Sequence, residues 1–136
     1  MEKEIKQYQG FDYIVYFYEP MGFYTAYVKL PESHPYRKLI DEKKIVFGRE
    51  LTIGYQKMDI DCHWGLTFGE VIKDEDKWPQ GFTSGAWIGW DYGHAGDFAI
   101  REYGYNSHDA THWSYESVES DCKKVIEQLL KIQCEK

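Results

Sequence analysis

One segment of the chain, residues 87–97, places titratable side chains next to a glycine inside an aromatic run. His94 lies between Asp91 and Asp97, and Gly89 interrupts a series of bulky residues. A glycine within a strand leaves space for another group to approach the backbone. Titratable groups beside such a space are typical of a functional site. The segment is therefore the first candidate for chemistry.

Residues 63–70 repeat this combination of histidine and glycine, and we expect them to contribute to the same site. The glycines would allow close approach of a ligand, tryptophan rings would stack on it, and imidazole and carboxylate groups would fix its polar edges. The expected ligand-binding residues are His63, Gly65, Thr67, Trp87, Gly89, Asp91, His94 and Asp97.

A structural role for the aromatic rings is the competing interpretation. Side chains alternate along residues 59–68 and again along 87–92, as in half-buried strands. This alternation places Trp64 and Trp90 on apolar faces and favours a core position for both. Trp87 lies on the glycine side, where the two interpretations are nearly balanced.

A metal-dependent hydrolase is the first alternative function, because carboxylates and imidazoles can bind a divalent cation that activates water. The candidate ligands are Asp61, His63, Asp91, His94 and Asp97. Their spacing matches no standard motif. Hydrogen bonds in a turn and at a strand end would explain Asp91, His94 and Asp97 without a metal.

Other catalytic signals are weak. His108 and His112 have helical spacing, but the glutamate of a metalloprotease motif is missing. Cys62 falls on the apolar face of its predicted strand, where cysteine behaves as a small hydrophobic residue. Ser84 has no identifiable base, and no phosphate-binding or dinucleotide fingerprint is present.

These candidate residues must be positioned by strands. Residues 11–18 and 23–30, joined by a Pro-Gly turn, predict a hairpin. Residues 45–47 and 51–55 are expected to be extended, with Gly48 and Gly54 as bulges. If 63–68 and 87–92 are neighbouring strands, their glycine faces would line a shallow pocket. Residues 1–9 are expected to fray, and 71–85 to form a mobile surface loop.

The C-terminal segment predicts a helix. Val118, Cys122, Val125, Ile126, Leu129 and Leu130 form one apolar stripe. Ser117 is the expected N-cap, and a short helix is expected near residues 36–43. We predict a single α+β domain over residues 1–136, with a mainly antiparallel sheet and the C-terminal helix packed on one face.

Composition limits the partners. The 136-residue chain has a net charge of −7 and scattered basic residues, which disfavours non-specific binding to nucleic acid or anionic membranes. Aromatic residues make up 18% of the chain. Three cysteines without a C-x-x-C pair, and no apparent signal peptide or long apolar run, favour reduced thiols in a cytosol.

The segments His63-Trp-Gly-Leu-Thr67 and 87–97 resemble those of a widespread family encoded by bacteriophages, prophages and plasmids. Its members share a His-Gly-Gly-Leu-Thr segment and a later Asp-x-x-His-Ala-Gly-Asp segment. The likeness extends to residues 33–35 and 127–129, and the chain departs from it at Trp64 and at Tyr92-Gly93. Because the family is uncharacterised, the resemblance implies a mobile-element origin and no particular activity.

The resulting hypothesis is a phage- or prophage-type accessory protein in the cytoplasm of a bacterial host. It would bind a small polar or aromatic, nucleotide-like ligand, sequestering or sensing it without turnover and without a cofactor. The alternatives are the divalent-metal hydrolase and an acidic inhibitor that covers a basic surface of a host protein.

Overall fold

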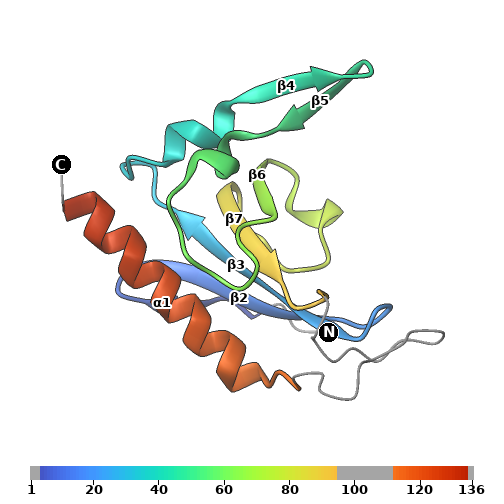
Figure 1. Ribbon diagram of the computed structural model, residues 1–136, viewed down its shortest axis with the longest axis vertical. Coiled ribbons are helices and arrows are strands. Elements are labelled where there is room, and N and C mark those ends of the chain that lie inside the picture. Colours follow the sequence, from blue (N-terminus) through green and yellow to red (C-terminus); the bar gives the residue numbers. More distant parts are fainter. Residues whose placement is uncertain (1–3, 95–111, 135–136) are drawn as a thin grey trace.

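The computed structural model describes residues 4–94 and 112–134 and shows an α+β domain (Figure 1). Five antiparallel strands form the main sheet in the order β1-β2-β3-β7-β6, and β4 and β5 form a separate hairpin. The expected fold class is confirmed. The strands are β1 Lys6–Tyr8, β2 Phe11–Tyr18, β3 Phe23–Leu30, β4 Lys43–Val46, β5 Arg49–Thr52, β6 Phe68–Ile72 and β7 Gly85–Asp91, and the helix is α1 Tyr115–Cys134.

The β2–β3 hairpin has the boundaries that the sequence predicts. Its strands pair from Tyr13 with Val28 to Tyr18 with Phe23. Gly22 closes the turn, donating its N–H to the Tyr18 carbonyl at 2.8 Å with a φ of 70°. A left-handed φ is readily adopted by glycine, which explains why the turn ends there.

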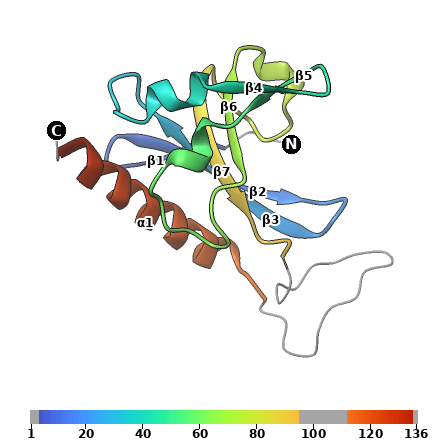
Figure 2. The ribbon, with the colours of Figure 1, turned by 45° about the horizontal axis from the view of Figure 1, so that its top comes forward.

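Helix α1 covers one face of the sheet, as expected (Figure 2). The predicted stripe is buried from Val118 to Leu129, and Leu130 is partly buried. The N-cap is Ser114 rather than Ser117, because the Ser114 hydroxyl accepts the N–H of Ser117 at 3.1 Å. Ser117 returns the contact by accepting the Ser114 N–H at 2.9 Å, so the two serines form a reciprocal cap.

The opposite face of the sheet is covered by irregular chain. Trp87, Tyr27 and Phe82 are buried there in a second hydrophobic cluster. The expected surface loop over residues 71–85 is therefore wrong in part, since β6 continues to Ile72 and Phe82 is only 1% exposed. A 3-10 turn, Glu75–Lys77, lies within this covering segment.

Three further local predictions need correction. Residues 59–67 are not a strand, because β6 begins only at Phe68. The N-terminal region is not wholly frayed, since β1 pairs with β2. Gly48 lies in the tight turn between β4 and β5, and Gly54 begins a 3-10 turn, Gly54–Lys57, so neither is a bulge.

The connection between β3 and β4 contains one further short element. The helix expected near residues 36–43 is a 3-10 turn over Arg37–Asp41. The β4–β5 hairpin stands away from α1 in both ribbon views. Within the described part of the chain, no helix combines the length and the apolar character that crossing a membrane requires.

Candidate functional site

Three segments meet at the end of β7: the turn at residues 62–67, the stretch 92–94 and the approach to α1 at 112–114. His63 stacks on Tyr92, with ring centroids 4.7 Å apart and planes 11° apart. The His63 ring also makes an edge contact with Trp113 at 4.8 Å. The His63 and His94 centroids lie 6.1 Å apart, so the two segments singled out in the sequence do come together.

Asp91 organises the polar side of this cluster. Its carboxylate accepts the Gly93 N–H at 3.0 Å and the Thr67 hydroxyl at 3.3 Å. His94 Nε2 lies 3.2 Å from the same carboxylate. The Thr67 N–H in turn donates to the Gly89 carbonyl at 3.0 Å. The strand end is therefore hydrogen-bonded as the structural interpretation of Asp91 expects.

Tyr92 connects the cluster to the helix. Its hydroxyl donates to Asp121 on α1 at 2.6 Å and accepts the Trp90 indole N–H at 3.0 Å. Burial, followed by the hydrogen bond to Asp121, raises the pKa of Tyr92 far above its usual range. Tyr92 is therefore a neutral hydrogen-bonding group that ties β7 to α1.

Trp64 does not occupy the core position that alternation predicts. The ring is 61% exposed and stacks on His94, with centroids 4.9 Å apart and planes 13° apart. Its backbone is left-handed, with a φ of 59°, and Gly65 follows with a φ of 80°. This turn interrupts the strand-like alternation of side chains. The alternation therefore does not predict the direction of the Trp64 side chain.

Gly65 and Gly89 do not form the floor of a pocket. A Cβ atom at Gly89 would lie 2.5 Å from the Tyr27 ring and 2.8 Å from the Ala26 carbonyl oxygen. The space that the glycine leaves is thus filled from within the protein. Gly65 lies in the turn, with no atom within 4 Å of a Cβ placed there.

Trp87 is a core residue on the face opposite α1. The side chain has no exposed surface, and its indole N–H donates to the Thr83 carbonyl at 2.8 Å. Trp87 could stack on a ligand only if the segment around Phe82 moved away from that face. Trp90, as predicted, is buried beneath α1.

A cavity of about 340 Å³ lies beside the cluster. Small-molecule pockets commonly enclose roughly 300–1,000 Å³, so its size suits a small ligand. His63 and Trp113 provide its aromatic wall. The described residues of its lining are Asp61, Cys62, His63, Trp113, Asp121 and Lys124.

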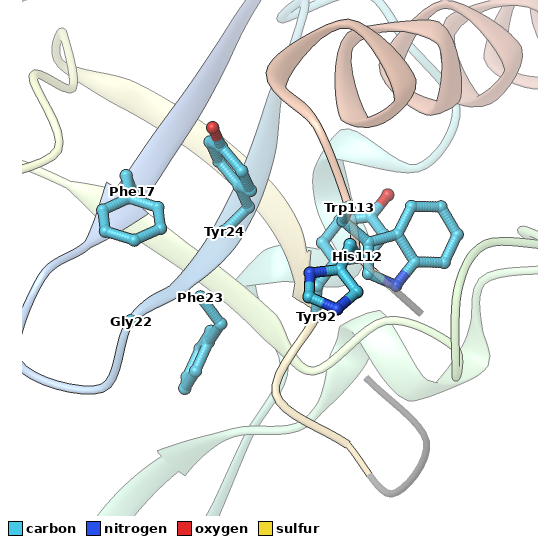
Figure 3. A pocket seen from close by; sticks show the side chains of 7 residues that line it. All are labelled: Phe17, Gly22, Phe23, Tyr24, Tyr92, His112 and Trp113. Atoms are coloured by element: carbon cyan, nitrogen blue, oxygen red, sulfur yellow. The ribbon is translucent and has the colours of Figure 1, made fainter. Parts of the chain in front are cut away.

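A second cavity of about 200 Å³ lies on the other side of Trp113. Figure 3 shows the His112, Trp113 and Tyr92 side chains on one side of it and Phe17 and Tyr24 across from them. Trp113 lines both cavities and therefore separates them. Because the second cavity is smaller, it is the weaker candidate for a ligand.

Trp113, Asp121 and Lys124 line the cavity but are not among the residues predicted from the sequence. Asp121 and Lys124 lie one turn apart at the margin of the apolar stripe of α1, with their charged atoms 4.0 Å apart. Because both residues lie beside the apolar stripe, the sequence pattern could have identified them as candidates for the site. Which margin of the helix borders the site depends on packing that periodicity does not specify.

Catalytic interpretations gain little from the geometry. Burial, with a smaller contribution from Asp61, raises the pKa of Cys62 to about 12, so the thiol is a poor nucleophile near neutral pH. Among residues 4–94 and 112–134, no three His, Cys, Asp or Glu side chains are grouped to hold a metal ion. Asp97 and His108, which the hydrolase and two-histidine hypotheses use, lie outside the described residues.

Asp61 is held at the cavity by its backbone. The Asp61 N–H donates to Gln128 Oε1, and the Gln128 amide donates back to the Asp61 carbonyl, both at 2.7 Å. This pair fixes the 59–67 segment to α1 and leaves the Asp61 side chain among the cavity-lining groups.

Comparisons with protein-family models, curated proteins and solved structures give no match to this chain.

Proposed function

We propose that the chain binds a small planar ligand with polar edges, such as a nucleotide-like signal, in the cavity beside His63, and sequesters or senses it without turnover. The observation that carries this proposal is the aromatic wall. The rings of His63 and Trp113 border a cavity of suitable size, and the buried Tyr92 ring packs against both from behind. Aromatic faces of this kind stack on bases and similar rings.

The charged rim supports a ligand with both donors and acceptors. Asp61 and Asp121 are acceptors, and Lys124 is the basic residue of the lining. A base edge or a ribose could hydrogen-bond to the carboxylates, while an anionic group could approach Lys124. The raised pKa of Cys62 favours binding over nucleophilic catalysis. In this proposal the protein is a phage- or prophage-type accessory protein of the host cytoplasm.

Isothermal titration calorimetry with free bases, nucleosides and nucleoside monophosphates tests the proposal. We expect saturable binding of one class, and stabilisation of the fold by roughly 3 kcal/mol at a hundredfold excess over Kd. Trp113→Phe should weaken that binding by changing the aromatic wall. Lys124→Met should weaken only ligands that carry a phosphate, because it removes the basic group of the lining.

Phe47→Ala is the matched control, since Phe47 is exposed on the β4–β5 hairpin, away from the cavity. It should leave binding unchanged. If no compound of the three classes binds, or if Trp113→Phe and Lys124→Met bind as well as the parent, this cavity is not the site.

A further inference from the structure

A third cavity, of about 340 Å³, lies on the face of the sheet opposite α1, and the proposed nucleotide-like ligand does not account for it. Strand register explains how it forms. Tyr16 pairs with Thr25, and Thr25 pairs with Asp91, so these three side chains lie in one row across β2, β3 and β7. Tyr18 and Phe23 form the next row towards the β2–β3 turn. The described residues of the lining are Tyr16, Tyr18, Phe23, Thr25, Tyr27, Gln80 and Asp91.

The cavity forms where the irregular segment that covers this face of the sheet ends. Tyr27, only 6% exposed, belongs both to the buried cluster and to the cavity lining. Gln80, from the covering segment, donates its amide N–H to the Tyr27 hydroxyl at 3.4 Å. Beyond Gln80, the row of Tyr16, Thr25 and Asp91 remains open to solvent in part.

The lining combines aromatic rings with hydrogen-bond acceptors. Gln80 Oε1 is shielded from solvent and has no hydrogen-bond partner among the described residues. Among the described residues of the lining, Asp91 is the charged one, and none is Lys or Arg. Its carboxylate is oriented by Thr67 and the Gly93 N–H, and His94 Nε2 lies 3.2 Å from it.

This chemistry favours a cation that carries a hydrogen-bond donor. Aromatic faces attract ammonium groups, and a neighbouring carboxylate adds to that attraction. An N–H or O–H on the same molecule would satisfy Gln80 Oε1, which otherwise remains a buried acceptor without a partner. A phosphate or other anion would meet Asp91, and no described residue of the lining offers it a basic partner.

We propose that this cavity is a second, independent binding site, which takes a small organic ammonium compound bearing a hydroxyl or N–H donor. The ammonium group would lie against the Tyr16 and Tyr18 side, near Asp91. The donor would reach Gln80. The described linings of this cavity and of the His63 cavity have no residue in common. The contacts of Asp91 with Thr67, Gly93 and His94 connect the two regions, but the proposal does not depend on the nucleotide-like ligand.

Choline is a suitable probe, because it carries a quaternary ammonium group and a hydroxyl on a short chain. Its neutral carbon isostere, 3,3-dimethylbutan-1-ol, has the same shape without the charge, and tetramethylammonium has the charge without the hydroxyl. We expect choline to shift backbone amide signals of β2, β3 and Gln80 in an NMR titration. Its Kd should be about tenfold lower than that of the isostere, with tetramethylammonium between them.

Variants separate this site from the other one. Tyr18→Ala, at a side chain 39% exposed, and Gln80→Leu should weaken choline binding without unfolding the protein. Lys124→Met and Phe47→Ala should leave it unchanged. Equal affinity for choline and its isostere, no saturable shifts with choline, or shifts that map to Trp113 and α1 would each overturn the proposal. If a variant loses choline binding but still binds the nucleotide normally, the proposal for the His63 cavity is unaffected.

Discussion

The two faces of β7 are both buried, but different kinds of chain cover them. Ile88, Trp90 and Tyr92 pack with the apolar stripe of α1. On the other face, Trp87 packs with Phe82 from an irregular segment and with Tyr27 of the neighbouring strand. The helix forms a continuous cover along the sheet, whereas the irregular cover ends near Gln80.

This difference determines where cavities form. On the helix face, the cavity beside His63 lies at the margin of α1, where Asp121 and Lys124 replace apolar side chains. On the opposite face, the cavity beside Asp91 lies beyond the end of the covering segment. Asp91 and Tyr92 are adjacent in sequence and point to opposite faces, so Asp91 lines one cavity while Tyr92 stacks on His63 of the other.

The largest expected effect is that of truncating the opposite face. Trp87→Ala should lower the free energy of unfolding by about 3–5 kcal/mol, because it leaves a cavity and removes the bond to Thr83. Leu129→Ala on α1 should cost about 2–5 kcal/mol. Urea denaturation measures both. A Trp87→Ala cost below that of an exposed substitution such as Phe47→Ala would show that the irregular cover is not packed.

The sequence predicts the two faces unequally, for a physical reason. The stripe from Val118 to Leu130 repeats with the period of a helix, and the β2–β3 hairpin carries its own turn residues. Both are local signals and both are confirmed. The segment around Phe82, which covers the opposite face of the sheet, shows no hydrophobic periodicity. From the sequence alone it therefore resembles a surface loop.

Gly89→Ala tests the packing between the faces. A methyl group there would meet the Tyr27 ring and, more rigidly, the Ala26 carbonyl oxygen. We expect a loss of about 1–3 kcal/mol from this overpacking, measured by urea denaturation. Gly93→Ala is a useful comparison, because the three atoms nearest to its Cβ all belong to the Phe23 ring. An unchanged midpoint for Gly89→Ala would mean that the glycine leaves open space, as the sequence analysis expected.

Tyr92→Phe tests the connection between β7 and α1. Removing the hydroxyl takes an acceptor from Trp90 and a donor from Asp121, both partly or fully buried, and should cost about 1–3 kcal/mol. Tyr24→Phe is the control, because the Tyr24 hydroxyl makes no hydrogen bond among the described residues. Equal thermal stability of the two variants would contradict the assigned role of the Tyr92 hydroxyl.

Acid titration tests the start of α1, where Glu119 contacts Tyr13 at 2.8 Å and Lys6 at 3.1 Å. Burial raises the pKa of Glu119, but these hydrogen bonds outweigh it and lower the pKa below its usual value. The stability they contribute is therefore present above the unfolded-state pKa, about 4.3, and is lost as pH falls through the lower folded-state pKa.

We expect this contribution to stay below about 1 kcal/mol, since Glu119 is near solvent and its charge is screened. Glu119→Gln should unfold with a weaker dependence on pH between about 5 and 3 than the parent chain. Denaturation midpoints across that pH range measure the difference. Parallel curves for variant and parent would show that Glu119 is not linked to folding.

Among the described residues, His63 is the member of the predicted ligand-binding set that lines the candidate cavity, and Asp61 comes from the metal hypothesis. The meeting of His63 with His94, and of Asp91 with Thr67, follows the two segments that the sequence singled out. Trp113 could not be placed, because it comes from a distant part of the chain. The predicted position of Trp64 was wrong because two consecutive left-handed residues, Trp64 and Gly65, end the alternation on which that prediction depended.

Trp64→Ala should have the smallest effect on stability. The ring contacts His94 but is mostly exposed, so we expect the free energy of unfolding to change by less than about 0.5 kcal/mol. If the exposed ring also serves the proposed ligand, nucleotide binding should weaken in this stable variant, while choline binding stays unchanged. Calorimetry on the same preparation measures both. A substantially destabilised Trp64→Ala protein with parental nucleotide affinity would instead assign Trp64 to the fold, as a ring that holds His94 against Asp91.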